Sequence, residues 1–156
     1  MSCAFAEIER SSWDGPRNVL QQLVGSWCLR RSIDNGASMT GRAVITDKND
    51  GQFGYREQGQ LRLSDGRLID AERCYIFAED AAGFRVLFSE SPPRLFHRIA
   101  LSRVGPNLIG DGIHLCGDDR YDSRYEFRVD GSFIVRHGVV GPRKRYTIET
   151  RYCRQA

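Results

Sequence analysis

The stretch 141-GPRKRYTIETRYCR-154, close to the end of the chain, decides the fold. Its side chains alternate between two faces, one with Tyr146, Ile148, Thr150 and Tyr152 and the other with Thr147, Glu149, Arg151 and Cys153. This period of two predicts a long β-strand with one buried face. At about 3.3 Å per residue, the straight strand would span roughly 40 Å, so it has to bend inside a small domain. A long, curved strand with two different faces is typical of the wall of a β-barrel.

Upstream of this strand, the chain repeats the same alternation between turn sequences. Strand-like segments cover 26–33, 40–47, 52–63, 67–77, 84–89, 95–103, 108–117, 121–129, 132–140 and 143–154. Tight turns are predicted at 34-DNG-36, 49-NDG-51, 65-DG-66 and 130-DG-131, since Asp, Asn and Gly tolerate positive φ. A slightly longer turn is predicted at 105-GPN-107. The pattern predicts an all-β fold, an antiparallel up-and-down barrel of about 8–10 strands that leaves no exposed edge. A β-sandwich is the alternative architecture.

One short helix is expected before the strands. Asp14 or Gly15 is placed to cap a helix that begins at Pro16 and ends near Gly25, with apolar residues at 19, 20, 23 and 24. We therefore divide the chain into a lead-in, 1–15, and a single barrel domain, 16–156. In the lead-in, Ile8 and Trp13 are expected to pack on the outside of the barrel.

Composition is that of an ordinary soluble domain. The 156 residues are 40% hydrophobic and 28% charged, with a net charge of +3, which argues against disorder and against a membrane-spanning chain. The basic residues are not gathered in a long run. We interpret the cluster Arg143, Lys144 and Arg145 as a solvated strand end, so no nucleic-acid partner is expected.

The cysteines and the N-terminus indicate the compartment. Cys3, Cys28, Cys74, Cys116 and Cys153 are odd in number and scattered, which argues against a disulfide framework. The N-terminus lacks the apolar core of a signal peptide. We expect a cytoplasmic protein, either a monomer or a homodimer.

The motif Gly25-Ser26-Trp27 resembles the GxW signature of lipocalin-like, or calycin, barrels. A wider set of residues is similar to the uncharacterised domain-of-unknown-function family 6314 over about residues 20–154. The set comprises GxWxLxR at 25–31, Gly54-Tyr55 with Glu57, Phe96-His97, His114 with Cys116 and Tyr121, and GPRK at 141–144 with Tyr146, Thr150 and Tyr152. The resemblance implies a calycin barrel in which Trp27 plugs one end under Arg151 or Arg154. It implies no activity.

Polar residues on apolar faces are the candidates for ligand binding, because an interior polar group needs a partner. Glu57 and Arg73 are both expected to point inward and to pair with each other or with a ligand. The full set of predicted ligand-binding residues is Tyr55, Glu57, Arg73, Tyr75, Tyr125, Lys144 and Tyr152. His137 is a further interior imidazole candidate.

A second group could carry acid–base chemistry. It consists of His97, His114, Tyr121 and Tyr146, with Lys144 two residues from Tyr146. His97 shares a predicted face with Leu95, Ile99 and Leu101. Together with Cys116, the two histidines could also form a haem or metal site, or a Cys–His nucleophilic pair. No fourth metal ligand is apparent, so we expect neither metal nor cofactor.

The leading hypothesis is a barrel that binds a small, partly apolar molecule in its cavity, with Arg73 and Lys144 favouring an anion. The alternative is a cofactor-independent isomerase, cyclase or hydrolase. A haem or metal barrel is the third possibility.

Overall fold

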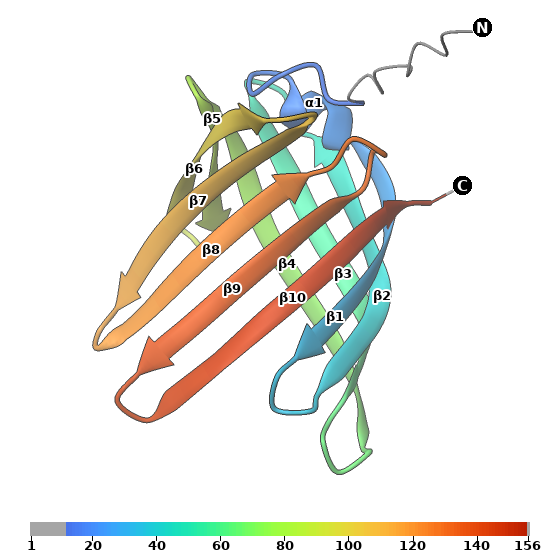
Figure 1. Cartoon of the computed structure of the whole chain (residues 1–156), viewed down its shortest axis with the longest axis vertical. Coiled ribbons are helices and arrows are strands. Elements are labelled where there is room, and N and C mark those ends of the chain that lie inside the picture. The colour runs from blue at the N-terminus through green and yellow to red at the C-terminus, as the bar shows by residue number, and fades with distance from the viewer. Residues whose placement is uncertain (1–11, 156) are drawn as a thin grey trace, which may run out of the picture.

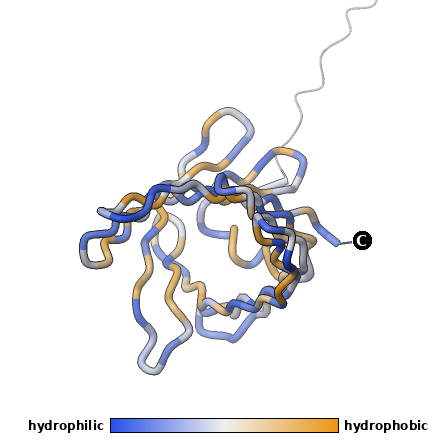
Figure 2. The backbone as a smooth tube through the Cα atoms, turned by 90° about the horizontal axis from the view of Figure 1, so that it is seen from below, coloured by the Kyte–Doolittle hydropathy of each residue, from blue (hydrophilic) through white to orange (hydrophobic). Residues whose placement is uncertain are grey.

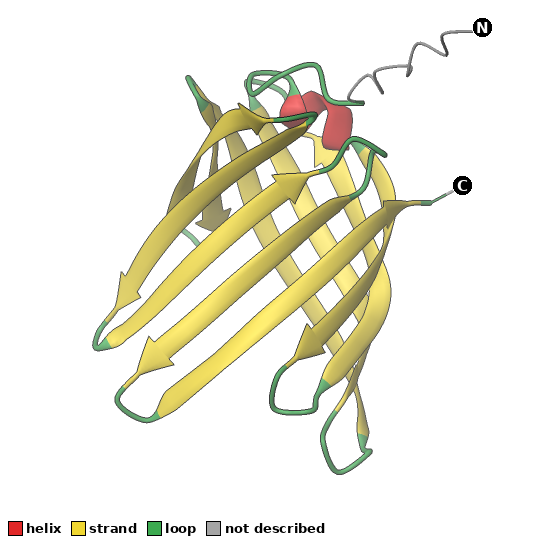
Figure 3. Cartoon of the chain, in the orientation of Figure 1, coloured by secondary structure: helices red, strands yellow, loops and turns green. Residues whose placement is uncertain are grey.

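The computed structural model describes residues 12–155, which form one short helix and ten β-strands (Figures 1 and 3). The helix is α1 (Val19–Leu23). The strands are β1 (Gly25–Ile33), β2 (Ser38–Asp47), β3 (Gln52–Arg62), β4 (Leu68–Asp80), β5 (Gly83–Phe88), β6 (Arg94–Val104), β7 (Asn107–Cys116), β8 (Asp119–Phe127), β9 (Phe133–Gly141) and β10 (Lys144–Arg154).

The strands close into a single antiparallel barrel. Each strand pairs with its neighbours in the chain, and β1 pairs with β10 to complete the ring. Viewed along the barrel from below, the backbone forms that ring (Figure 2). The predicted up-and-down barrel is therefore confirmed, and the sandwich alternative is wrong.

The tight turns form where the sequence predicts them. In the β2–β3 hairpin, Asn49, Asp50 and Gly51 have φ of 69°, 55° and 72°. Gly36, Gly66 and Gly131 also have positive φ, from 87° to 91°. These conformations are accessible to Gly, Asn and Asp at little cost, so the local sequence sets the hairpins and, through them, the register.

The last strand has the predicted two faces. Thr150 and Tyr152 point inward and are buried, at 2% and 5% exposed, whereas Arg151 and Cys153 are exposed. Its long pairings with β9 and β1 join the two ends of the sheet. The barrel thus depends on this strand for closure.

The helix covers one end of the barrel, but it is shorter than predicted (Figure 3). It spans only Val19–Leu23, and residues 16–18 form a turn in which the N–H of Asn18 donates to the carbonyl of Gly15 at 3.2 Å. Asn18 occupies the N-cap position and makes no side-chain capping bond, so the prediction of a cap at Asp14 or Gly15 was wrong. Burial of the apolar helix face holds this segment in place of a cap.

Trp13 lies inside the same end, which corrects the prediction that it packs on the outside. It is 2% exposed, its ring centre is 5.0 Å from that of Phe127, and its Nε1 donates to the carbonyl of Arg128 at 2.8 Å. A large indole gains more from a buried site with a hydrogen-bond acceptor than from a wet surface. The prediction for Ile8 lies outside the described residues.

Trp27 closes the core beneath the helix, and Arg154 is the arginine that stacks on it. Trp27 is fully buried, and the guanidinium of Arg154 lies 4.2 Å from its ring centre. Arg154 also donates to the carbonyls of Val24 and Gln22, at 2.9 and 2.6 Å. One side chain therefore joins the last strand to the C-terminal end of α1.

A register shift in β6 changes which residues face the interior. Val86 pairs with His97 but Leu87 pairs with Leu95, which leaves Phe96 as an extra residue. Both Phe96 and His97 are therefore buried, at 9% and 1% exposed, whereas Leu95 is 41% exposed. The prediction that Leu95 shares a face with His97 was wrong.

Two further observations concern the described residues. Cys28, Cys74, Cys116 and Cys153 are free and exposed. Across residues 12–155, no helix is long and apolar enough to cross a membrane.

Candidate functional site

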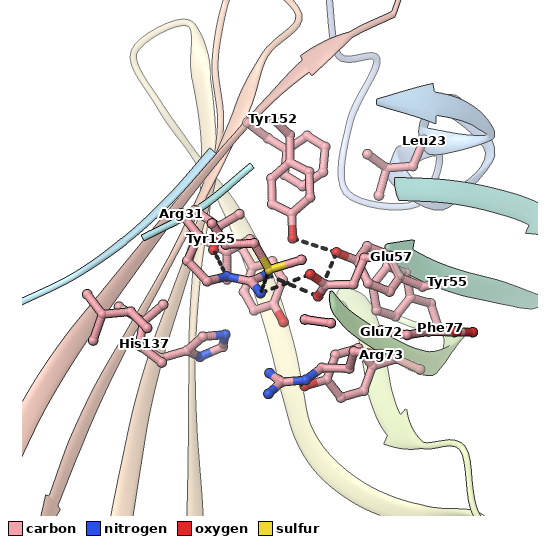
Figure 4. Close-up of a pocket in the computed structure, with 18 of the residues that line it drawn as sticks. Leu23, Arg31, Tyr55, Glu57, Glu72, Arg73, Phe77, Tyr125, His137 and Tyr152 are labelled. Carbon is pink, nitrogen blue, oxygen red and sulfur yellow. Dashed lines mark hydrogen bonds and ion pairs between the residues drawn. The ribbon is translucent and has the colours of Figure 1, made fainter. Parts of the chain in front are cut away.

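The barrel encloses a cavity of about 170 Å³, which we call the inner cavity. Its apolar lining includes Leu23, Phe77, Phe84, Phe127, Phe133 and Val135. Its polar lining includes Arg31, Tyr55, Glu57, Arg73, His137, Thr150 and Tyr152 (Figure 4). Leu23 belongs to α1, so the helix closes this cavity at one end. The few polar groups among many apolar ones match the usual composition of a ligand site.

A second hollow of about 480 Å³, which we call the mouth pocket, lies at the barrel end away from α1. It is lined by residues near the β5–β6, β7–β8 and β9–β10 turns, including Phe88, Phe96, His114, Tyr121 and Tyr146. Arg73, Tyr75, His137 and Ile148 line both hollows. The two hollows therefore adjoin at these four residues.

Aromatic rings give the inner cavity its apolar walls. Phe133 and Tyr152 stack with ring centres 4.2 Å apart and an interplanar angle of 7°. Phe84 meets Tyr125 edge to face at 5.3 Å. Rings packed in this way on one another resist rotation, so they form a fixed surface for an apolar ligand.

A buried polar cluster crosses this wall. Arg31 lies against Glu57 at two points, Nη1 to Oε2 at 2.9 Å and Nη2 to Oε1 at 3.0 Å, and its Nε donates to Oγ1 of Thr150 at 2.8 Å. The hydroxyl of Tyr55 donates to Oε1 of Glu57 at 3.2 Å and lies 2.7 Å from the hydroxyl of Tyr152. The charges and phenols of the cluster therefore pair with one another, although Oε2 of Glu57 makes only the ion-pair contact and no hydrogen bond among residues 12–155.

Burial decides the protonation of this cluster. Loss of water by itself lowers the pKa of Arg31, but the hydrogen bond and the charge of Glu57 outweigh that effect, so the pKa is raised and the guanidinium stays charged. Burial, together with the charge of Glu57, raises the pKa of Tyr152 to about 12. Burial likewise raises the pKa of Tyr55 well above its ordinary value. Both phenols are neutral hydrogen-bonding groups near pH 7.

The partner of Glu57 differs from the prediction. Glu57 does point inward, and it lies opposite Arg73 in the β3–β4 register, but its ion pair is with Arg31. Arg31 was not among the site residues predicted from the sequence. The available signal was its place two residues after Leu29 and four after Trp27, on the inward face of β1.

Arg73 is exposed to solvent and has no acidic partner among the described residues. Its Nη1 donates to the hydroxyl of Tyr75 at 3.2 Å, and its guanidinium lies 5.9 Å from the centre of that ring. In the described part of the chain, no carboxylate lies within ion-pair distance of it. The other described arginines of the two hollows, Arg31 and Arg94, are paired with Glu57 and Glu90.

His97 lies behind the cavity wall and lines neither hollow. Its Nε2 is 2.9 Å from the hydroxyl of Tyr125, and its Nδ1 has no hydrogen-bond partner among residues 12–155. Burial, with smaller effects of His137 and His114, lowers the pKa of His97 to about 3. The imidazole is therefore neutral and positions Tyr125, which does line the inner cavity.

His114, Tyr121 and Tyr146 all line the mouth pocket. The ring of His114 stacks on Phe96 with centres 5.1 Å apart, and its centre is 6.0 Å from that of Tyr121. The structure thus brings three of the four predicted acid–base residues to one hollow and keeps His97 apart from it.

The histidines and cysteines do not converge as a metal site would require. Within residues 12–155, no group of three His, Cys, Asp or Glu side chains is arranged to hold a metal ion. Cys116 is exposed at the mouth, whereas His97 is buried and bonded to Tyr125. His97 follows the regular alternation of Ile99 and Leu101 into the interior, so it does not meet Cys116 at the exposed rim.

Lys144 does not reach either hollow. Its ammonium lies 2.9 Å from Oδ2 of Asp119 on the outside of the barrel rim. This ion pair raises the pKa of Lys144. The remaining predicted ligand-binding residues, Tyr55, Glu57, Arg73, Tyr75, Tyr125 and Tyr152, all line the inner cavity.

Comparison with known proteins gives a family and a fold. A family model described as "Family of unknown function (DUF6314)" matches residues 23–154. No curated protein matches the chain.

Among solved structures, the S-type phycobiliprotein lyase CPES from Guillardia theta is 8% identical over 91% of this chain and 93% of its own, with a TM-score of 0.55. The barrel EF1p2_mFAP2b, bound to DFHBI, is 14% identical over 91% and 100%, with a TM-score of 0.49. The fluorescent protein UnaG is 15% identical over 87% and 99%, with a TM-score of 0.40. At such identities, the likeness to the lyase concerns the fold alone.

Proposed function

Because this chain belongs to DUF6314, a family of unknown function, we propose its function from its own cavity: it binds a small, partly apolar molecule inside the barrel. The observation that carries the proposal is a hollow walled by packed rings, which α1 closes at one end and which adjoins the mouth pocket. Burial of an apolar ring system in this hollow is favourable by about 25 cal/mol of free energy per Å² of apolar surface removed from water.

The size of the cavity limits the ligand. Its volume of about 170 Å³ is below the ~300–1,000 Å³ of sites for drug-sized molecules. A bicyclic body is of the right scale for the inner cavity, and a larger ligand would extend into the mouth pocket. Arg31, Glu57, Thr150, Tyr55 and Tyr152 already bond to one another, so an apolar body does not leave these groups unpaired.

Titration with 2-naphthamide, an uncharged bicyclic probe, tests the proposal. Saturable one-site binding, followed by probe fluorescence and by calorimetry, is expected for the purified protein. Val135→Trp fills the inner cavity and should abolish binding. Val140→Trp, on the same strand but at a position 44% exposed, is the matched control and should leave it unchanged.

A thermal melt of both variants establishes that they are folded. If Val135→Trp stays folded and binds like the parent protein, the inner cavity is not the site. If neither 2-naphthamide nor its charged analogue 2-naphthoate binds, the proposed function fails.

A second candidate function, a cofactor-independent isomerase, cyclase or hydrolase, is favoured by His114, Tyr121 and Tyr146 in the mouth pocket. Acid and base groups around one hollow could move a proton on a ligand held below them. Native mass spectrometry after exposure to a metabolite extract separates the two functions. If the protein is an enzyme, only the His114→Ala variant should retain the unconverted ligand. If it is a binding protein, the parent protein and His114→Ala should both retain a ligand of the same mass.

We also maintain the prediction of a cytoplasmic monomer or homodimer with no nucleic-acid partner. Light scattering on a size-exclusion column measures the oligomeric state. The protein should not be retained on a heparin column at physiological salt, because its basic residues are spread out and paired.

A further inference from the structure

Arg73 and His137 lie where the inner cavity and the mouth pocket adjoin. They come from β4 and β9, and with Tyr75 and Ile148 they are the residues that line both hollows; we call this set the waist. Figure 4 shows the guanidinium of Arg73 and the imidazole of His137 pointing toward one another across the open space.

We propose that the waist is an oxyanion subsite, in which a carboxylate or similar group of the ligand bridges Arg73 and His137 while His137 takes up a proton. This inference rests on the proposed function, since it assigns a chemical class to the molecule that the cavity holds. The ligand is then an aromatic or other apolar body that carries one anionic group.

The distribution of charge supports an anion at this place. Glu57 neutralises Arg31 on the wall, and Glu72, the other acid of the inner cavity, is directed to Arg56 at 2.8 Å. Arg73 therefore remains at the waist as a solvent-exposed cation that no carboxylate of the described residues pairs. A carboxylate placed against it forms a charge-assisted hydrogen bond, which is about twice as strong as a neutral one.

The hydrogen bonding of His137 leaves one ring nitrogen for the ligand. Its Nδ1 is 2.7 Å from Oγ of Ser123. In a ring held in this way, the opposite nitrogen, Nε2, is the one available to the cavity that the side chain lines. A protonated His137 would donate from Nε2 to the anion and from Nδ1 to the serine oxygen.

The groups that face His137 keep it neutral in the free protein. They are Arg31 from β1, Arg73 from β4, His97 from β6 with ring centres 6.3 Å apart, and Tyr125 from β8 at 6.5 Å, while β10 presents Ile148 opposite it. Burial first, and then the charges of Arg31 and Arg73, lower the pKa of His137 to about 4. An anion at the waist offsets those two charges.

Proton uptake therefore accompanies anion binding. Between the pKa of the free protein, about 4, and the higher pKa of the complex, the complex holds a proton that the free protein does not. Affinity for the anion should rise as the pH falls through the pKa of the complex, by up to about tenfold per pH unit. An uncharged ligand of the same shape should show no such dependence.

The experiment compares 2-naphthoate with 2-naphthamide, which share a ring system and differ in charge. Calorimetry between pH 5.5 and 8, in two buffers of different ionisation enthalpy, gives the affinity of each probe and the number of protons taken up. At pH 6, the parent protein should bind 2-naphthoate about tenfold more tightly than 2-naphthamide. A tenfold difference is the scale of one hydrogen bond to a charged group. Uptake of a fraction of one proton should accompany 2-naphthoate alone.

Three variants test which residues cause the preference for 2-naphthoate and the proton uptake. Arg73→Gln should remove the preference for 2-naphthoate at every pH, and His137→Gln should remove proton uptake and pH dependence. Both should keep the affinity for 2-naphthamide within about twofold, which also shows that they are folded. Arg98→Gln, an exposed arginine paired with Asp80, is the control and should behave like the parent.

The outcomes separate this inference from the proposed function. Equal binding of the two probes by the parent protein overturns the oxyanion subsite and leaves the cavity as a ligand site. Tight 2-naphthoate binding without proton uptake overturns the part assigned to His137. Failure of both probes to bind overturns the proposed function itself.

Discussion

Arg31 and Glu57 form a two-point ion pair inside the barrel, with Nη1–Oε2 and Nη2–Oε1 distances of 2.9 and 3.0 Å. Their strands, β1 and β3, are not paired, because β2 lies between them. The side chains are 12% and 2% exposed, so the pair spans the inner face of the sheet out of water. It holds the polar part of the cavity wall in one arrangement.

Breaking this pair should cost far more than breaking a surface pair. Glu57→Leu leaves the Arg31 charge buried and unpaired, and we expect the free energy of unfolding to fall by about 3–5 kcal/mol. Arg31→Met with Glu57→Leu removes both charges and should recover most of that loss. Urea unfolding measures both values.

The surface control is Arg56→Ala, whose ion pair with Glu72 is 59% and 49% exposed at the two side chains. Its expected loss is below about 1 kcal/mol. If Glu57→Leu lowers the free energy of unfolding by no more than Arg56→Ala does, the buried pair does not stabilise the wall.

Arg154 should be more important for stability than Arg151, although both lie on β10. Arg154→Ala removes the stacking on Trp27 and two bonds to carbonyls near the end of α1, and we expect a loss of about 1–3 kcal/mol. Arg151→Ala removes an exposed pair with Glu149 and should cost less than about 1 kcal/mol. Thermal melts of the two variants make the comparison. Similar melting temperatures for the two would contradict the assigned role.

The buried histidines should make the protein less stable in mild acid. The unfolded chain takes up protons on histidine near pH 6.5, whereas His97 and His137 in the folded protein do so only near about 3 and 4. Above about pH 6.5, these histidines are neutral in both the folded and the unfolded state, so they do not lower the stability. As the pH falls from about 6.5, each histidine removes up to about 1.4 kcal/mol per pH unit.

Urea unfolding from pH 7 to pH 5 tests the assignment. His97→Phe should reduce the slope of stability against pH, because one of the two groups no longer titrates. Tyr125→Phe removes the partner of His97 but retains the imidazole, so it should lower stability and keep the slope. An unchanged slope in His97→Phe would exclude His97 as a source of the acid sensitivity.

Two glycines bring β2 and β3 close together. Gly41 and Gly59 face each other in the register, and a Cβ at either position would collide with the backbone carbonyl of Gln58 or Thr40, respectively. Gly59→Ala should lower the free energy of unfolding by about 1–3 kcal/mol, since one of the strands must shift. At Gly138, a Cβ would only touch the carbonyl oxygen of Asp122 at 3.9 Å. Gly138→Ala is therefore the control, and equal melting temperatures for the two variants would contradict the close approach.

Local sequence was sufficient to predict the barrel. Alternation along 141–154 is confirmed by the burial of Thr150 and Tyr152, and the Asn49-Asp50-Gly51 turn adopts the positive φ that its residues allow. Strand period and turn conformation depend on a few neighbouring residues, so they can be read from the chain without knowing the fold. For the same reason Glu57, Tyr55 and Tyr152 could be placed on inward faces.

The site, by contrast, was decided by tertiary structure. Three features of the site depend on strands that are distant in the chain. They are the cation that pairs with Glu57, the choice of Phe96 over Leu95 as an inward residue, and the position of Arg73 across from His137. Closure and curvature of the barrel set these distances, and a single bulge in β6 reversed one local prediction. The sequence by itself determined the strands, the turns and their inward faces. Only the closed barrel determined which of those inward side chains meet across the cavity, because such contacts join residues through space and leave no period in the chain.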